Sequence, residues 1–266
     1  MGVCYKWLCN KLNVGYSTLH ESTLLLKNSL SEMGLPASRE ILGQFSTYHD
    51  FLKSWNAKVN LTTVVTWEQA VERHYLDSAA ITLAYSFKKK SEHQRIRVLD
   101  VGSGGGFPGV PLKILFPDIC LTLLDSVKKK TVFLEKATAH LGLKPVAILG
   151  HRAESAANEQ QHRQAYDLVV ARAVAELRVL AELTLPFCKI GGTVVAIKGE
   201  NISSELENSF GAIAKLGGEI SAIIDCSNKF EFLKSNLVVI SKIAETPSRF
   251  PRRPGIPSKR PIMRDT

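Results

Sequence analysis

Short runs rich in Val, Ile and Leu alternate with helix-length segments through the middle of the chain. Five such runs are IRVLDV (96–101), CLTLLD (120–125), PVAIL (145–149), YDLVVA (166–171) and TVVAI (193–197). Runs that are apolar throughout are typical of strands buried on both faces, and intervening helices allow consecutive strands to lie parallel. Two further runs, EISAIIDC (219–226) and NLVVISKI (236–243), follow each other closely and suit an antiparallel hairpin. The pattern predicts an α/β, Rossmann-like sheet of seven mostly parallel strands with an antiparallel edge hairpin.

The first part of the chain has a different periodicity. Apolar residues recur there at steps of four and three, which predicts one face of a long helix from about residue 38: Ile41, Phe45, Tyr48, Leu52, Trp55 and Val59. Thr66 and Gln69 have capping-box spacing before a second helical stretch. The predicted organisation is a poorly defined extension (1–22), a helical segment (23–95) packed on an α/β domain (96–246), and a tail (247–266).

The tail concentrates the positive charge of the chain. Of a net charge of +9, the last twenty residues hold six Lys or Arg against Asp265 alone, and they also hold five of the eleven prolines. Such proline spacing predicts an extended, stiff strip with its cations kept apart. Composition alone favours a disordered, solubilising end, and a nucleic-acid backbone that these cations follow is the alternative. No apolar run approaches the roughly 20 residues of a membrane helix, and the five cysteines lack paired metal-ligand spacing. We therefore expect a soluble cytoplasmic protein with no membrane or metal partner.

A glycine-rich loop, VLDVGSGGGFPG (98–109), follows the first predicted strand. Open α/β sheets bind ligands at this end of the strands, and glycines at 102, 104 and 106 allow a tight turn and a close backbone approach. A formal GxGxxG at 104–109 also permits a nicotinamide dinucleotide. Asp100, two residues before Gly102, suits a cationic ligand instead, and Asp125 ends the second strand where it can accept ribose hydroxyls. This combination favours an S-adenosylmethionine-dependent methyltransferase.

The later strands narrow the choice of methyl acceptor. Ala153 and Glu154 follow the third strand, where an acidic residue lies beside the adenine in methyltransferases of this type. The fourth strand runs into ARAVAEL (171–177), which lacks the D/N-P-P-Y/F motif of enzymes that methylate exocyclic amines. Cys188 lies in an apolar setting that predicts a core residue rather than a nucleophile for cytosine C5.

Eight motifs occur in order along the chain: WNAKVNLT, RHYLDS, LDVGSGGGFPGVPL, LLDSVKKKTVFLE, HRAE, ARAVAEL, AIKG and PRRPGIPSKRP. From about residue 24 to 261 the chain resembles the RsmG (GidB) family of bacterial 16S ribosomal RNA methyltransferases. The resemblance implies transfer of a methyl group from S-adenosylmethionine to N7 of a guanine in the 530 loop, leaving S-adenosylhomocysteine. It assigns cofactor contacts to Gly102, Phe107, Asp125, Ala153, Glu154 and Arg172, to which the glycine loop adds Asp100 and Gly104. Residues 1–22 have no counterpart in it.

Guanine N7 carries a free lone pair, so the reaction needs no general base, and catalysis consists of positioning. Arg172 and Lys198 are the predicted positioning residues. The predicted RNA contacts are Arg73, His74, Lys198, Arg252, Arg253, Lys259 and Arg260, with the small ribosomal subunit or its 16S RNA as partner and a monomeric enzyme. Two alternatives stay open: an NAD(P)-dependent oxidoreductase using the formal GxGxxG, and a non-catalytic RNA-binding protein that retains the fold.

Overall fold

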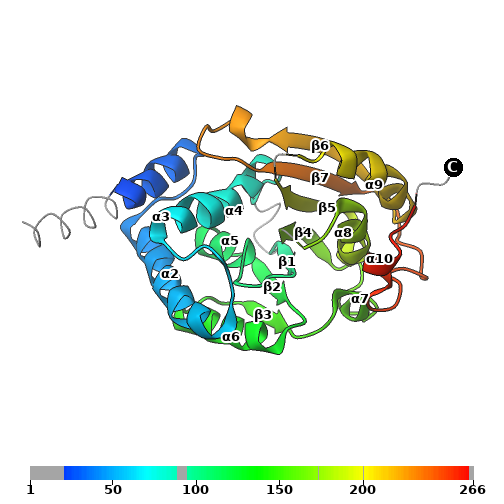
Figure 1. The fold of residues 1–266 in the computed structure, drawn as a ribbon, viewed down its shortest axis with the longest axis horizontal. Helices are drawn as coiled ribbons and strands as arrows, with labels where there is room; N and C mark the ends of the chain where they lie inside the picture. Colours follow the sequence, from blue (N-terminus) through cyan, green and yellow to red (C-terminus); the bar gives the residue numbers. More distant parts are fainter. Residues whose placement is uncertain (1–20, 89–94, 173, 200, 264–266) are drawn as a thin grey trace, which may run out of the picture.

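One seven-stranded sheet forms the centre of the protein (Figure 1), whose computed structural model describes residues 21–88, 95–172, 174–199 and 201–263. The strands are β1 (Arg97–Val101), β2 (Cys120–Leu124), β3 (Val146–Leu149), β4 (Tyr166–Arg172), β5 (Cys188–Lys198), β6 (Gly218–Asp225) and β7 (Asn236–Lys242). Their order is β3-β2-β1-β4-β5-β7-β6, and β7 runs antiparallel to both β5 and β6. The mostly parallel sheet and its antiparallel edge hairpin are thereby confirmed.

Helices cover both faces of this sheet (Figure 1). They are α5 (Gly109–Leu115), α6 (Lys128–His140), α7 (Ala153–Ala156), α8 (Leu177–Thr184), α9 (Ser203–Lys215) and α10 (Ile256–Lys259). Successive residues of a strand point to opposite faces, and β4 shows the result. Leu168 and Val170 pack in the core that contains α5 and α6, whereas Val169 and Ala171 pack in the core that contains α8 and α9. Both faces are buried, which explains why the strand runs are apolar throughout.

The N-terminal segment adds a helical layer to the α5–α6 side. Its elements are α2 (Arg39–Val59), α3 (Trp67–Ala70), the π-helix η1 (Val71–Leu76), α4 (Asp77–Ala79) and the 3-10 helix η2 (Ala80–Leu83). The predicted long helix and the Thr66 cap are both confirmed, since the Thr66 side chain accepts the Gln69 amide. Phe45, Tyr48 and Tyr75 are fully buried in the same core as the β1 and β2 side chains. The helical segment therefore shares a core with the sheet.

The structure corrects two expectations. The fifth strand begins before the apolar run at 193–197, because α8 ends at Thr184 and a short 3-10 turn containing Pro186 leads into β5 at Cys188. Proline lacks the amide donor that a continuing helix would need. Cys188 is fully buried, as expected of a core residue, but it begins a strand.

The second correction concerns the tail, which is not an extended strip over 247–263. Phe250 and Ile262 are buried in the α8–α9 core, and Ile256–Lys259 form α10 beside α8 (Figure 1). Within the residues described, no helix has the length and apolarity that a membrane span requires.

Candidate active site

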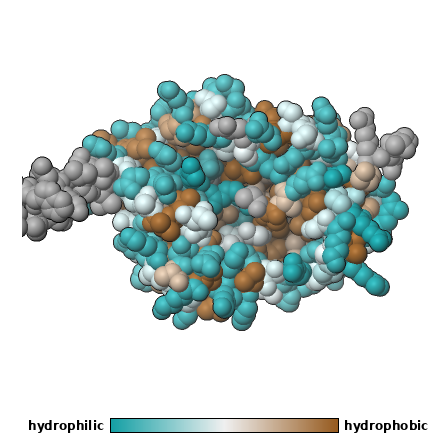
Figure 2. All heavy atoms as spheres, viewed as in Figure 1, coloured by the Kyte–Doolittle hydropathy of each residue, from teal (hydrophilic) through white to brown (hydrophobic). Residues whose placement is uncertain are grey.

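A pocket of about 370 Å³ opens at the carboxyl ends of β1, β2 and β4. Its lining comprises Val101, Gly102, Leu124, Asp125, Ser126, Val127, Lys130, His151, Arg152, Ala153, Glu154, Arg172, Val174, Ala175, Leu183, Gly255 and Ser258. Figure 2 shows the corresponding face of the molecule, with apolar side chains exposed near its middle and hydrophilic ones around them. Five of the predicted cofactor contacts, Gly102, Asp125, Ala153, Glu154 and Arg172, are brought together in this one pocket.

The glycine loop is shaped by close approaches on both of its sides. Gly102 has φ +73, and a Cβ atom there would lie 2.8 Å from Cγ2 of Val174, across the pocket from β1. Gly106 has φ +89, and a Cβ atom there would lie 2.5 Å from the Tyr48 hydroxyl. Tyr48 donates a hydrogen bond to the Gly105 carbonyl, so α2 packs directly on the loop. The glycines thus serve the pocket on one side and helix packing on the other.

Asp125 connects the glycine loop to the end of β2. Its carboxylate accepts the Gly104 amide at 2.9 Å through one oxygen and the Val127 amide at 2.8 Å through the other. A carboxylate has about four lone-pair positions, so these two bonds leave acceptor capacity on the pocket side. Gly104 does not line the pocket itself; its amide orients the Asp125 side chain that does.

Asp100 lies beneath the loop and does not line the pocket. The side chain is fully buried, one oxygen accepts the Gly109 amide at 2.9 Å, and the other oxygen has no hydrogen-bond partner among the described residues. Burial raises the pKa of Asp100 to about 7, against the lowering effects of the Gly109 amide and the Arg172 guanidinium. Asp100 is therefore poised to ionise near neutral pH when positive charge comes close.

Arg172 ends β4 and faces the N-terminal segment. Its Nη1 donates to the Arg73 carbonyl at 2.7 Å and lies 3.0 Å from Nδ1 of His74. The guanidinium carbon lies 4.9 Å from the centre of the Phe107 ring. Phe107 is 4 % exposed and does not reach the pocket lining, so it acts as the floor under Arg172.

Glu154 joins the pocket to the tail. Its carboxylate, which is 6 % exposed, accepts the Gly255 amide at 2.8 Å. Gly255 and Ser258 of the tail complete the pocket wall on this side. The acidic residue predicted beside the adenine therefore also fixes the chain segment that closes the pocket.

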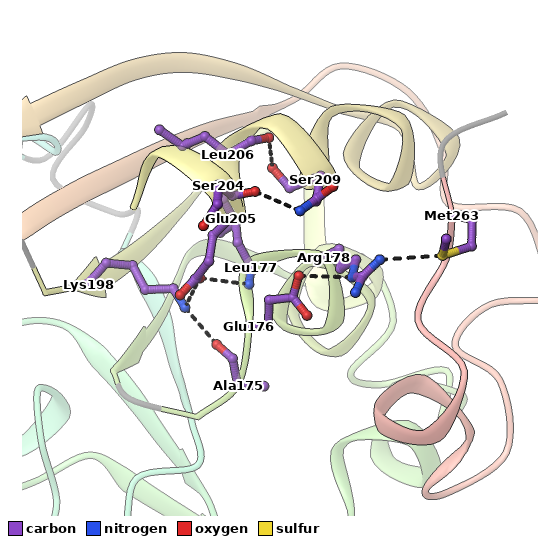
Figure 3. Close-up of polar contacts among 11 residues, drawn as sticks. Ala175, Glu176, Leu177, Arg178, Lys198, Ser204, Glu205, Leu206, Ser209 and Met263 are labelled. Carbon is purple, nitrogen blue, oxygen red and sulfur yellow. Dashed lines mark hydrogen bonds and ion pairs between the residues drawn. The ribbon is translucent and has the colours of Figure 1, made fainter. Parts of the chain in front are cut away.

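Lys198 points toward Ala175 and Glu205 (Figure 3). Its side chain is 9 % exposed, and Nζ lies 2.7 Å from the Ala175 carbonyl and 2.5 Å from the Glu205 carboxylate. The same carboxylate accepts the Leu177 amide at 3.0 Å. Lys198 thus holds the segment after β4 against α9, and its charge is balanced internally.

The other predicted RNA contacts fall into two groups. Arg73, Arg253, Lys259 and Arg260 are exposed. His74 is 6 % exposed, and Arg252 makes two hydrogen bonds of 2.6 and 2.9 Å from its side chain to Glu182, a carboxylate that is fully buried. The exposed residues of the first group are available to a polyanion. His74 and Arg252 instead make contacts inside the fold.

Sequence reasoning missed five polar residues of the pocket: Ser126, Lys130, His151, Arg152 and Ser258. Lys130 belongs to a lysine run that reads as a solvated helix face, and the first turn of α6 directs it toward Gly104. Its position five residues after Asp125 was the available signal, because α6 begins beside the pocket. No local sequence pattern pointed to Ser258, because the tail reaches the pocket through contacts with residues that are distant in the sequence.

The strand order, the antiparallel β7, the glycine loop and the carboxylate at the end of β2 define the fold of S-adenosylmethionine-dependent methyltransferases. A crystal structure of a MtNAS variant in complex with S-adenosylmethionine shares this fold, with a TM-score of 0.50, 11% identity and coverage of 76% of this chain and 74% of that one. That likeness concerns the fold alone.

Sequence comparison identifies the family. The family described as "rRNA small subunit methyltransferase G" matches residues 41–237. The "Ribosomal RNA small subunit methyltransferase G" of Alkaliphilus metalliredigens is 41% identical over 91% of this chain and 99% of that protein. The protein of that name from Dehalococcoides mccartyi strain BAV1 is 44% identical over 88% of this chain and 97% of that protein. The chain belongs to the rRNA small subunit methyltransferase G family, which confirms the resemblance and does not favour the oxidoreductase alternative.

Proposed function

We propose that this protein transfers a methyl group from S-adenosylmethionine to N7 of a guanine in the 530 loop of 16S ribosomal RNA. The observation that carries the proposal is the single pocket shared by Gly102, Asp125, Ala153, Glu154 and Arg172. Family membership over residues 41–237 supports the reaction class and the RNA. The proposal extends to a monomeric enzyme that meets its RNA substrate in the cytoplasm.

The residues present fit S-adenosylmethionine. Asp125 offers a carboxylate to the ribose hydroxyls, and Glu154 with the Ala153 backbone suits the adenine. Gly102 leaves the backbone uncovered, because any side chain there would strike Val174. One oxygen of Asp100 has no hydrogen-bond partner among the described residues. Ionisation of this carboxyl group places a negative charge beneath the glycine loop, which suits a cationic ligand.

Bound S-adenosylmethionine supplies an electrophilic methyl group on a sulfonium and leaves as S-adenosylhomocysteine. The side chains have no proton to remove, because the N7 lone pair is free. Their contribution is orientation, which can lower a barrier by about 7–11 kcal/mol. Arg172, fixed on Phe107 at the end of β4, is the positioning residue that the geometry favours.

The RNA is held by exposed cations on both sides of the pocket. Arg73 lies on the N-terminal segment, and Arg253, Lys259 and Arg260 lie on the tail. Lys198, His74 and Arg252 support the surfaces that carry these cations. This division revises the sequence-based interpretation, in which all seven residues contact RNA directly.

The test is transfer of labelled methyl from S-adenosylmethionine to small ribosomal subunits, or to their RNA, taken from cells that lack this enzyme. Chemical cleavage at 7-methylguanosine should then map the label to one guanine of the 530 loop. RNA binding without label would favour the non-catalytic alternative. Label at another atom or another loop would contradict the assigned position while retaining the reaction class.

A further inference from the structure

The π-helix η1 presents two consecutive groups to one nitrogen of Arg172. The Arg73 carbonyl and the His74 imidazole both lie within 3.0 Å of Nη1. These two residues are about a hundred positions from Arg172 in the sequence, on the segment that covers the glycine loop. A π-helical turn departs from regular helix geometry and often occurs at functional sites.

The surroundings of His74 fix which of its nitrogens faces Arg172. Nε2 lies 2.9 Å from the Thr62 hydroxyl, and Nδ1 lies 3.0 Å from Nη1 of Arg172. Nδ1 also lies 2.9 Å from the Arg73 carbonyl. A guanidinium can only donate hydrogen bonds, so the contact with Arg172 requires Nδ1 to accept and the ring proton to lie on Nε2, with the Arg73 carbonyl accepting from Nη1 of Arg172 instead. Burial and the Arg172 charge lower the pKa of His74 to about 3, so the ring is neutral near pH 7. A neutral imidazole with this tautomer is a fixed acceptor.

Phe107 completes the arrangement. The His74 and Phe107 ring centres are 4.1 Å apart, and the Arg172 guanidinium lies over the same phenyl ring. Opposite charge is provided by Asp77 and Asp100, both of which attract the guanidinium. Arg172 is thus held by a cation–π contact and by two hydrogen bonds at one end of its planar group.

We propose that His74 is a positioning residue that, together with the Arg73 carbonyl, fixes the orientation of the Arg172 guanidinium at the pocket. The proposal rests on the proposed function for what Arg172 does, and on the geometry alone for how it is held. This positioning role replaces the direct RNA contact that the sequence predicted for His74. The His74 side chain is 6 % exposed, and both of its ring nitrogens already have partners.

Two substitutions separate the acceptor from the ring. His74→Phe keeps an aromatic ring on Phe107 but removes the Nδ1 acceptor, whereas His74→Asn keeps an acceptor near the Nδ1 position. Nitrogen-detected NMR of arginine side chains, with signals assigned by Arg172→Ala, reports how fast the two Nη groups exchange. We expect His74→Phe to accelerate this exchange by about tenfold, because it removes one hydrogen bond to a charged group. His74→Asn should return it close to the wild-type rate.

The matched control is His162→Phe. His162 is also a nearly buried histidine, hydrogen-bonded to Tyr166 and absent from the pocket lining. Its substitution should leave the Arg172 exchange unchanged. Equal exchange rates in wild type and His74→Phe would overturn the proposal. If His74→Phe does not fold by circular dichroism, Thr62→Val removes the partner that sets the tautomer and should also accelerate the exchange.

A double-mutant cycle on methyl transfer gives the second readout. His74→Phe should lower kcat/KM by about 10- to 100-fold in the wild-type background and cause no further loss in Arg172→Ala. The same loss in both backgrounds would contradict positioning and support an independent role. The NMR result does not depend on methylation, so a wild-type protein that fails to label RNA would refute the proposed function alone.

Discussion

The N-terminal helical segment and the C-terminal tail lie on opposite sides of the sheet (Figure 1) and are fastened by different interactions. The N-terminal segment buries large rings, including Phe45, Tyr48 and Tyr75, in a core it shares with β1 and β2. The tail buries Phe250 and Ile262 and is also held by polar bonds to distant residues.

Glu182 and Arg163 hold the tail in addition to the Glu154–Gly255 bond. Glu182 of α8 accepts the backbone amide of Arg252 at 2.8 Å as well as its guanidinium. Arg163 donates to the carbonyls of Thr246 and Phe250 at 2.8 and 2.9 Å. Apolar burial leaves a period in the sequence, whereas single polar bonds between distant residues do not. This difference explains why the packing of the N-terminal segment could be predicted from the sequence and the packing of the tail could not.

The largest effect is expected where the N-terminal segment meets the glycine loop. Gly106→Ala combines a left-handed backbone with a Cβ atom 2.5 Å from the Tyr48 hydroxyl. Strain and overpacking together should reduce the free energy of unfolding by about 3–5 kcal/mol, measured by urea denaturation. Gly142→Ala is the matched control, because Gly142 has φ +64 with nothing within 4 Å of its Cβ position. Equal losses in both variants would show that Tyr48 does not press on the loop.

The two fully buried carboxyl groups offer the next test. Glu182 is paired with Arg252, whereas Asp100 receives one backbone amide and has a pKa raised by burial from 3.8 to about 7. Folded protein then binds more protons than unfolded protein between these values, so the Asp100 contribution to stability is present below pH 3.8 and is lost as pH rises to about 7.

The unfolding free energy of wild type should therefore fall relative to Asp100→Asn by about 2–4 kcal/mol between about pH 4 and about pH 8. The Asn side chain can still accept the Gly109 amide, which makes it a suitable reference. Urea denaturation at several pH values measures the difference. Parallel pH profiles for the two proteins would mean that Asp100 is ionised throughout.

A smaller effect on stability, with an effect on binding, is expected from the tail. Arg252→Ala leaves the buried Glu182 carboxylate with only the residue-252 amide, and should reduce stability by about 2 kcal/mol since the Arg252 side chain is partly exposed. S-adenosylmethionine affinity should fall as well, because Gly255 and Ser258 form part of the pocket wall. Lys189→Ala, at the more exposed pair with Asp167, should change stability by about 0–1 kcal/mol and leave affinity unchanged. Unchanged affinity in Arg252→Ala would separate the tail from the cofactor pocket.

Substitution of the exposed tail cations should weaken RNA binding specifically. It should have the smallest effect on cofactor binding. Replacing Arg253, Lys259 and Arg260 together by Ala should flatten the slope of log K for RNA against log salt by about 2, if each contacts one phosphate of unpaired RNA. Filter binding at several salt concentrations measures this slope. Cofactor affinity should stay unchanged, in contrast to Arg252→Ala. An unaltered slope would remove the tail surface from RNA binding.

Much of the fold was predictable because burial on both faces of a parallel sheet requires unbroken apolar strands. The pocket was predictable where function restricts local sequence, as at Gly102 and Asp125. The start of β5 was not, because the turn at Pro186 and the glycines at 191 and 192 read as the end of a helix. The uses of Lys198, Arg252 and His74 were not predictable either, because an exposed cation and an internal one have the same local sequence.

Direct binding of S-adenosylmethionine tests the central claim that this pocket is a methyltransferase cofactor site. Calorimetric titration of the full chain should give saturable one-to-one binding of S-adenosylmethionine. Asp125→Ala should weaken it by about tenfold or more, the loss of hydrogen bonds to a charged group. NADH should give no saturable heat. Saturable NADH binding without S-adenosylmethionine binding, or S-adenosylmethionine affinity unaffected by Asp125→Ala, would contradict the account.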